Sequence, residues 1–336
     1  MQKRGKSNLY ALKVAPGEFA GCIRRKGFRR LTPRAVIELA APQTWSASVL
    51  PVVVAAALAI AGGAPFSFLL FFSLLGTSVC LQCAVNTLND YSDFIGGVDR
   101  RDNCPDETDA SLLYHDYEPV LAFVVGCGFI LLGLVCGLYA LITVGPELLI
   151  FGAVGAAVVF AYSYGVVPLS YLPVGELLSG FVMGGVIPVA CYYAFTGRLS
   201  PFALLAGVPL ILTIGLIMLV NNACDIEKDI AAERHTLPAR VSRERAKRLH
   251  VLLFAAAIAA AAVVAVFRFG AVNLWMAPLL CLWLIPMEAE LIRTGFMPGN
   301  RVRAMSLATG VNIRLNAVYA VMILLPSVLG PGWNSP

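Results

Sequence analysis

The stretch N-T-L-N-D-Y-S-D-F-I-G-G-V-D at residues 86–99 decides the fold and divides the chain. It follows an apolar run from Phe66 to Val85 without a charged residue, so its carboxylates and amides come where a membrane helix leaves the bilayer. On a continuing helix, residues three, four and seven apart share one face, which would then carry Asn86, Asn89, Asp90 and Asp93. Like charges on one face repel one another unless a cation lies between them. The pattern therefore predicts a cation site.

A second stretch of the same kind, N-N-A-C-D-I-E-K-D at residues 221–229, ends a later apolar run. Its Asn222, Asp225 and Asp229 also share a helical face. Two such stretches predict one site with hard oxygen ligands for Mg²⁺, and Mg²⁺ bound in this way points to a phosphate-bearing substrate. The alternative is a pair of solvated acidic loops at the membrane surface. The pairing disfavours it, because polar groups at membrane depth are costly and usually functional.

The composition indicates an all-α, polytopic membrane protein and excludes a soluble domain. Of the 336 residues, 59% are hydrophobic and 13% are charged, and each membrane span needs about 20 apolar residues. Nine spans are predicted: Ala35–Ala61, Phe66–Asn89, Pro119–Ile142, Leu148–Val167, Val174–Phe195, Pro201–Asn222, Leu249–Phe267, Val272–Ile292 and Ala304–Leu329. The two acidic stretches end the second and sixth spans. Two four-helix halves plus one added helix would bring them together across a central cavity.

The positive charges predict the orientation of the chain. Ten of the 25 Lys and Arg lie in residues 1–34, a basic arm that precedes a transmembrane domain at 35–330. With nine spans, the loops on the same side as this arm hold all but two of the loop cations, so this side is cytoplasmic by the positive-inside rule. Both acidic stretches then face the cytoplasm of a cell membrane, and the C-terminus lies outside. Topology explains the charge of the basic arm, so no nucleic-acid partner is expected. Contact of the protein with membrane lipids is expected.

Further candidate residues flank the two acidic stretches. Gly96 and Gly97 predict a turn that points Asp99 back at the first stretch. The nearest cations to the second stretch are suited to the outer oxygens of a diphosphate: Lys228, Arg234 and Arg240. The block Y-S-Y-G-V-V-P-L-S-Y-L-P-V-G-E at residues 162–176 would line a pocket with Tyr162, Tyr164, Tyr171 and Glu176. An interfacial aromatic belt would explain the tyrosines equally well.

At these residues the chain resembles the UbiA superfamily of intramembrane aromatic prenyltransferases, over nearly all of its length after the basic arm. The family motif N-D-x-x-D is matched by Asn89, Asp90 and Asp93, and D-x-x-x-D by Asp225 and Asp229. The branch that it resembles most is that of the dihydroxynaphthoate polyprenyltransferases. Three features favour this branch: the six-residue spacing between Asp93 and Asp99, the block at 162–176 and the sequence R-H-T-L-P-A-R at 234–240.

The resemblance implies nine helices around a cavity open to lipid, and Mg²⁺-dependent transfer of a polyprenyl chain from polyprenyl diphosphate to an aromatic acceptor. In this branch the acceptor ring also loses its carboxylate as carbon dioxide. The expected metal ligands are Asn89, Asp90, Asp93, Asp225 and Asp229, the four aspartates being catalytic. The expected diphosphate-binding residues are Asn86, Asn89, Asp99, Lys228, Arg234 and Arg240. The expected acceptor-binding residues are Asn222, Tyr162, Tyr164 and Glu176.

Three departures from the family pattern each remove positive charge near this site. Residues 41–44 read A-P-Q-T where relatives often have R-P-K-T, Cys224 stands where many have Arg, and the loop after Asp99 lacks the usual G-P-x-R. Another acceptor is therefore an open alternative: hydroxybenzoate, homogentisate, a tetrapyrrole or a glyceryl phosphate lipid. A terpene cyclase and an ion-coupled transporter are further alternatives. The prenyl chain length and the oligomeric state stay open.

Overall fold

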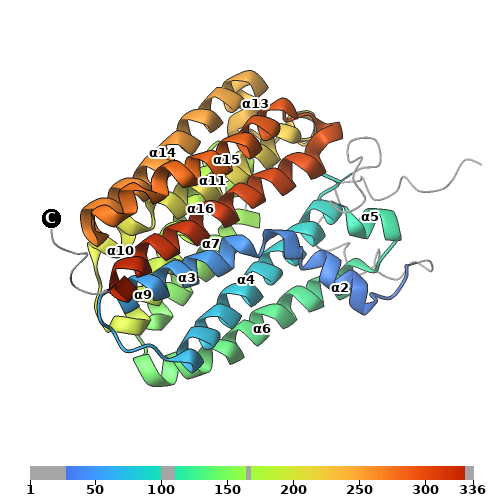
Figure 1. Cartoon of the computed structure of the whole chain (residues 1–336). Helices are drawn as coiled ribbons and strands as arrows, with labels where there is room; N and C mark the ends of the chain where they lie inside the picture. Colours follow the sequence, from blue (N-terminus) through green and yellow to red (C-terminus); the bar gives the residue numbers. More distant parts are fainter. Residues whose placement is uncertain (1–27, 100–109, 164–167, 330–336) are drawn as a thin grey trace, which may run out of the picture.

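The structure, a computed structural model, describes residues 28–99, 110–163 and 168–329. Within these ranges the chain is a bundle of helices (Figure 1). The longer helices are α3 (Ser46–Ala61), α4 (Phe68–Ile95), α6 (Pro119–Val144), α7 (Leu148–Ser163), α9 (Ile187–Thr196), α11 (Val208–Cys224), α14 (Arg243–Phe269), α15 (Met276–Arg293) and α16 (Arg301–Leu329). The shorter ones are α2 (Pro33–Leu39), α5 (Ser111–His115), α8 (Gly175–Phe181), α10 (Pro201–Ala206), α12 (Ile226–Ala231) and α13 (Leu237–Val241).

Membrane-spanning helices account for most of this bundle. Five are long and apolar enough to cross a membrane: Phe68–Ile95, Pro119–Val144, Gly175–Thr196, Arg243–Phe269 and Pro298–Ser327. A bent pair would make a sixth span, and the apolar helices Leu148–Val158 and Val208–Cys224 are shorter. Large apolar side chains such as Leu131, Ile142 and Leu252 point outward, as a lipid environment requires. The chain is an integral membrane protein, and its count of nine spans stays a prediction.

The first predicted span, Ala35–Ala61, is not one continuous helix. Ala41 adopts a left-handed backbone conformation with φ of 47°, and the 3₁₀ turn η1 (Pro42–Thr44) follows it. The two parts of this span meet at 54°. The cause is Pro42, because a proline disfavours the helical conformation in the residue before it. The A-P-Q-T segment is therefore a bend between α2 and α3.

In the first half of the chain, α4 and α6 lie side by side (Figure 1). Small residues bring their backbones together: a Cβ added at Gly126 would lie 2.7 Å from Cδ2 of Leu88. Two hydroxyls of α4 donate across the contact, from Ser73 to the carbonyl oxygen of Cys136 at 2.6 Å and from Thr77 to that of Gly133 at 3.2 Å. This contact fixes α4, whose last turns carry the first acidic stretch, against α6.

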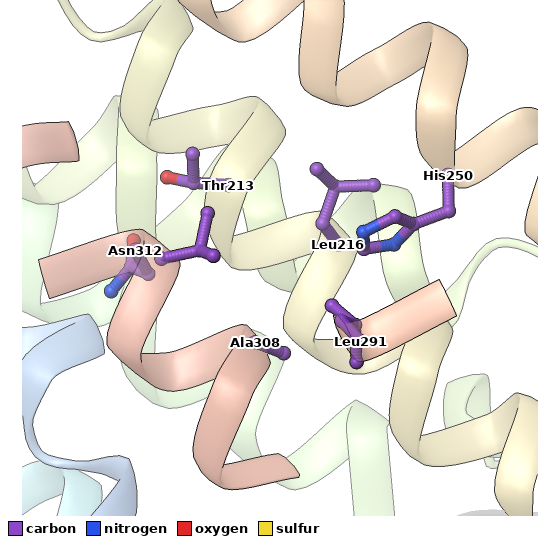
Figure 2. Close-up of a pocket in the computed structure, with 7 residues that line it drawn as sticks. Thr213, Leu216, His250, Leu291, Ala308 and Asn312 are labelled. Atoms are coloured by element: carbon purple, nitrogen blue, oxygen red, sulfur yellow. The ribbon is translucent and has the colours of Figure 1, made fainter. Parts of the chain in front are cut away.

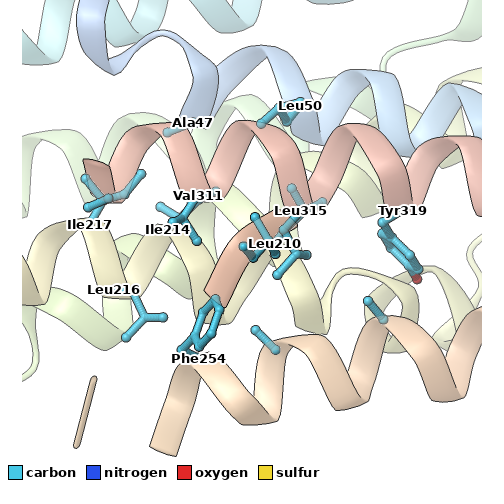
Figure 3. Packing of buried hydrophobic residues seen from close by; sticks show 14 of the residues in the cluster. Ala47, Leu50, Leu210, Ile214, Leu216, Ile217, Phe254, Val311, Leu315 and Tyr319 are labelled. Carbon is cyan, nitrogen blue, oxygen red and sulfur yellow. The ribbon is translucent and has the colours of Figure 1, made fainter. Parts of the chain in front are cut away.

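In the second half, α16 lies between α3 and α11 (Figure 3). Leu210, Ile214, Leu315 and Tyr319 belong to the main apolar core, and the Tyr319 hydroxyl donates to the carbonyl oxygen of Ala206 at 3.0 Å. Because α3 precedes α4 in the chain, this core joins the two halves. The last helix is thus part of the central packing.

Arg314, which the sequence places inside the last span, lies on the side of α16 that packs against α15. Its guanidinium carbon is 5.2 Å from the centroid of the Trp283 ring, and Nη1 donates to the carbonyl oxygen of Gly310 at 3.3 Å. A cation over an indole ring is stabilised by the ring quadrupole. This stacking accounts for a charged side chain at that depth.

Candidate active site

The first acidic stretch forms the last turns of α4 and the turn after it. Nδ2 of Asn89 donates to Oδ2 of Asp93 at 3.3 Å. Gly97 has φ of 68°, and this left-handed turn lets the amide nitrogen of Val98 return to the carbonyl oxygen of Asp93 at 2.9 Å. Asp99 is buried beside this turn. The backbone thus returns to the first stretch at Asp99, whose amide nitrogen donates to the carbonyl oxygen of Asp93 at 3.3 Å. Its role in the site stays a prediction.

The second acidic stretch is divided between two helices. α11 ends at Cys224, Asp225 has φ of −103° and ψ of 16°, and α12 begins at Ile226. The amide nitrogen of Asp229 still donates to the carbonyl oxygen of Asp225 at 2.8 Å, so the helical offset between these two aspartates is retained. The helix thus does not continue unbroken through this stretch, although the aspartates keep their spacing.

Two ion pairs connect the two stretches. Nζ of Lys228 lies 2.7 Å from Oδ1 of Asp99, and both side chains are buried. Nη2 of Arg234 donates to Oδ1 of Asp93, also in a largely buried environment. The two stretches therefore lie next to each other in space, with Lys228 and Arg234, two of the three cations predicted to bind diphosphate, paired across the contact.

The loop after α12 places Arg234. Glu233 takes a left-handed conformation with φ of 57°, after which the amide nitrogen of Arg234 donates to the carbonyl oxygen of Asp229 at 2.8 Å. The Arg234 guanidinium carbon lies 4.8 Å from the centroid of the Tyr171 ring. The amide nitrogen of His235 donates to the carbonyl oxygen of Tyr171 at 2.8 Å. Tyr171 thus supports Arg234 from the pocket-lining block.

Burial and neighbouring charges shift the acidity of these groups. Burial raises the pKa of Asp229 to about 7, against the opposing effects of the Thr236 hydroxyl, which donates to Oδ2 at 2.8 Å, and of Arg234. For Arg234, burial alone would lower the pKa, but Asp93 and Tyr171 outweigh it and raise the pKa overall. Arg234 is therefore a permanent cation, and the Asp229 carboxylate near it gives up its proton less readily than an exposed aspartate does.

Arg301 also belongs to the site, although it was not among the predicted site residues. It is the first residue of α16, and its Nε lies 3.1 Å from Oδ1 of Asp225. Its Nη2 donates to Oδ1 of Asn221 at 2.7 Å. The two positions are far apart in the sequence, so spacing alone could not pair them. The sequence signal nearest to it was Cys224, which stands where many relatives have Arg.

The predicted acceptor-binding residues gather on the second-half side of the site. Oε1 of the buried Glu176 accepts from Nδ2 of Asn222 at 2.8 Å and from the amide nitrogen of Leu237 at 3.3 Å. The ring of Tyr162 lies against Gly175, since a Cβ added there would be 3.8 Å from its Cε2. Tyr164 lies outside the described residues.

Two of the residues predicted to bind diphosphate, Asn86 and Arg240, lie apart from the ion pairs that join the two stretches. Nδ2 of Asn86 donates to the carbonyl oxygen of Ala40 at 3.1 Å and to Oγ1 of Thr44 at 2.9 Å, so this amide fastens α4 to the bend after α2. Arg240 is exposed on α13 and forms no ion pair with any residue that the structure describes. The structure brings neither side chain to the Asp93–Arg234 pair.

The donor set suits a hard divalent cation. In the described part of the chain, no group of three or more His, Cys, Asp or Glu side chains is close enough together to enclose a metal ion. Mg²⁺, however, is usually held by one or two carboxylates, with waters and substrate phosphates completing its octahedron. Oxygen ligands of this kind are present in both stretches: the Asn89 amide with the Asp90 and Asp93 carboxylates in the first, and the Asp225 and Asp229 carboxylates in the second. Their binding of a metal stays a prediction.

A small pocket elsewhere in the bundle is separate from this site (Figure 2). It lies among α11, α14, α15 and α16, and its lining includes Thr213, His250 and Asn312. No residue of either acidic stretch lines it. The central cavity between the halves stays a prediction.

Comparison with known proteins gives one family. The model of the UbiA prenyltransferase family matches residues 48–309. The chain is 28% identical over 292 residues to the 1,4-dihydroxy-2-naphthoate octaprenyltransferase of Bacillus subtilis (strain 168), covering 86% of this chain and 91% of that protein. It is 29% identical over 221 residues to the UbiA prenyltransferase domain-containing protein 1 homolog of Drosophila melanogaster, covering 63% of this chain and 59% of that one.

Solved structures share the fold. The UbiA homolog from Archaeoglobus fulgidus bound to GPP and Mg²⁺ superposes with a TM-score of 0.61 at 16% identity, covering 86% of this chain and 99% of that one. The apo UbiA homolog from Aeropyrum pernix K1 gives a TM-score of 0.61 at 17% identity, covering 80% and 95%. With the family model matching most of the chain, the protein belongs to the UbiA prenyltransferase family and is an integral-membrane prenyltransferase.

Proposed function

We propose that this enzyme transfers a polyprenyl chain from polyprenyl diphosphate to 1,4-dihydroxy-2-naphthoate, with loss of the carboxylate as carbon dioxide, giving demethylmenaquinol, the reduced form of demethylmenaquinone. The observation that carries the proposal is the junction of the two acidic stretches through Arg234–Asp93 and Lys228–Asp99. It creates one charged site from both halves of the chain. The acceptor is supported by the similarity to the Bacillus subtilis enzyme along nearly the whole of both proteins.

The two stretches bind the diphosphate in this proposal. Mg²⁺, held by Asn89, Asp90, Asp93, Asp225 and Asp229, would supply Lewis-acid stabilisation of the charge that grows on the departing diphosphate. Lys228, Arg234 and Arg301 neutralise the remaining charge by donating to its outer oxygens. Their present partners, Asp99, Asp93 and Asp225, hold these cations in place before the substrate arrives. Substrate binding is thus an exchange of partners within a prepared charge network.

The acceptor lies on the side of Asn222, Tyr162 and Glu176. As the bond between the prenyl carbon and the diphosphate oxygen breaks, that carbon becomes cationic and the electron-rich ring attacks it. Closure of the site against water protects the allylic cation from hydrolysis. The long apolar tail extends into the bilayer. The site faces the cytoplasmic side of the cell membrane in this proposal, with the N-terminus on the same side and the C-terminus outside.

The test is an activity assay on purified protein in nanodiscs, with dihydroxynaphthoate, a polyprenyl diphosphate and Mg²⁺. We expect a prenylated and decarboxylated product by mass spectrometry, which disappears when a chelator removes the metal. Diphosphate release with other acceptors but not with dihydroxynaphthoate would favour one of the alternative acceptors, for which the lost cations at residues 41–44 and at Cys224 are the motive.

Two aspartate variants test the site itself. Asp90→Ala and Asp225→Ala each remove a carboxylate from one stretch, so we expect turnover to be lost in both while the protein stays folded by size-exclusion chromatography. Glu290→Ala is the matched control, since Glu290 pairs with Arg303 at the surface end of α15. Turnover near the wild-type rate in either aspartate variant would contradict the assignment.

A further inference from the structure

Glu176 is a buried carboxylate of which only one oxygen is used. The residue is 5% exposed, and Oε1 accepts both hydrogen bonds, from Asn222 and from the amide nitrogen of Leu237. Oε2 is buried and has no hydrogen-bond partner among the residues that the structure describes. A buried polar atom without a partner costs free energy, so such an atom in a folded protein calls for a ligand or another explanation.

The surroundings of Glu176 fix this oxygen beside the reaction site. Asn222 lies on α11, three residues before Asp225. Leu237 directly follows Thr236, whose hydroxyl donates to Asp229. The same carboxylate is thus held by sequence neighbours of both aspartates of the second stretch.

The packing of α8 on α11 makes the position rigid. The Cβ that an alanine would add at Gly215 on α11 would lie 3.3 Å from the carbonyl oxygen of Glu176, and one at Gly180 would lie 2.4 Å from the carbonyl oxygen of Ile211. Backbones this close leave α8 little freedom to rotate. Glu176 therefore keeps its direction, which a group that orients a substrate needs.

We propose that Oε2 of Glu176 accepts the hydrogen bond of a ring hydroxyl on the acceptor and holds its proton during the transfer. The inference rests on the proposed function and deepens it, because it assigns the residue that takes the proton of the acceptor hydroxyl. Removing the proton pushes the electron pair of the O–H bond into the ring and makes the attacking carbon more nucleophilic. A fixed general base of this kind contributes about 10²- to 10⁴-fold to a rate.

The step balances in atoms and electrons. The O–H pair moves into the ring, the ring carbon forms a bond to C1 of the prenyl group, and the C1–O bond breaks with its pair on the diphosphate. The ring then loses carbon dioxide, and the pair of the broken C–C bond restores aromaticity. Glu176 returns its proton to the ring oxygen, so no other base or oxidant is needed.

A purely structural role for Glu176 is the competing explanation, and Glu176→Gln separates the two. The glutamine carbonyl oxygen can still accept from Asn222 and Leu237, whereas its amide nitrogen at the position of Oε2 cannot accept from a hydroxyl. The matched control is Glu288→Gln. Glu288 is similarly buried, at 6% exposure, and its carboxylate oxygens also have no hydrogen-bond partner among the described residues, but it faces His250 on α14, 2.9 Å away, and neither acidic stretch.

The experiment measures kcat, KM and ligand-induced shifts in Tm for wild type and both variants. We expect Glu176→Gln to lower kcat at least 100-fold, with the shift in Tm caused by Mg²⁺ and polyprenyl diphosphate unchanged, and Glu288→Gln to stay within threefold of wild type. An acceptor whose hydroxyl is more acidic should restore part of the lost rate. A Glu176→Gln rate within threefold of wild type, or loss of its response to Mg²⁺ and polyprenyl diphosphate, would overturn the inference.

A second measurement uses only the wild-type protein, in case the variant does not fold. The methyl ether of the acceptor lacks the hydroxyl proton, so we expect the enzyme not to prenylate it. Equal use of the ether and the parent acceptor would overturn the role of Glu176 and leave the proposed function standing. If the wild type prefers another hydroxylated arene to dihydroxynaphthoate, the proposed acceptor fails, and the same comparisons on that arene still test Glu176.

Discussion

At the scale of single residues, three carboxylates of the site each pair with a cation from another element. Asp93 pairs with Arg234, Asp99 with Lys228, and Asp225 with Arg301. Isolated buried charges are strongly unfavourable, so these pairs allow the acidic stretches to exist near the membrane in the absence of substrate. The same cations are then in place for a diphosphate.

Arg301 gives a prediction at this scale. We expect Arg301→Gln to lower kcat/KM for the prenyl diphosphate by about 10- to 150-fold, because a hydrogen bond to a charged group contributes roughly 1.5–3 kcal/mol. The measurement is steady-state kinetics at saturating acceptor. Arg303→Gln is the control: it lies two residues further along α16, and its pair with Glu290 is exposed, where ion pairs contribute little. Equal effects of the two substitutions would refute a specific role for Arg301.

At the scale of elements, the functional groups are positioned by helices whose backbones touch directly, with no side chain between the two backbones. α8 continues through the π-helical segment η3 (Val182–Val186), with sequence V-M-G-G-V, into α9. A Cβ at Gly184 would lie 2.3 Å from the amide nitrogen of Ile211, closer than real atoms approach. The glycines of this segment therefore determine how closely Glu176 approaches α11.

Gly184→Ala tests this contact. We expect it to destabilise the protein by about 1–3 kcal/mol or more, because an added methyl group in a closely packed interior forces the helices apart. The readout is Tm in detergent together with residual turnover. Gly152→Ala on α7 is the control, since a Cβ there has no atom within 4 Å. An unchanged Tm for Gly184→Ala would show that α8 and α11 separate easily.

At the scale of the whole molecule, the site joins two halves of the chain. α4 with α6 carries the first stretch and α11 with α12 carries the second, while α16 packs between α3 and α11 (Figures 1 and 3). A ligand that contacts both stretches therefore stabilises the assembly of the halves, as well as their local structure.

We expect Mg²⁺ and a polyprenyl diphosphate together to raise Tm, whereas either one alone has little effect. Binding to the folded state alone stabilises it by RT ln(1 + [L]/Kd), which is about 2.7 kcal/mol at a ligand concentration of 100 Kd. Thermal unfolding in nanodiscs with and without a chelator measures this effect. A full shift that persists in the presence of the chelator would argue against a divalent metal in the site.

The sequence by itself determined the class of fold, the two acidic stretches and the family. These properties depend on apolar length and on residues within two helical turns of one another, such as Asp90 with Asp93 and Asp225 with Asp229. It also indicated that Lys228 and Arg234 belong with the acidic stretches, because both lie just beyond the second one.

Only the tertiary structure decided the partners across the bundle. The packing of α16 pairs Arg301 with Asp225, and the packing of α2 lets Asn86 bind the bend at Ala41. The packing of α8 leaves one oxygen of Glu176 without a hydrogen-bond partner among the described residues. Helix packing brings together residues at arbitrary sequence separation, and no local periodicity records it. For that reason the sequence indicated the chemistry of the site, and packing determined which side chains face one another.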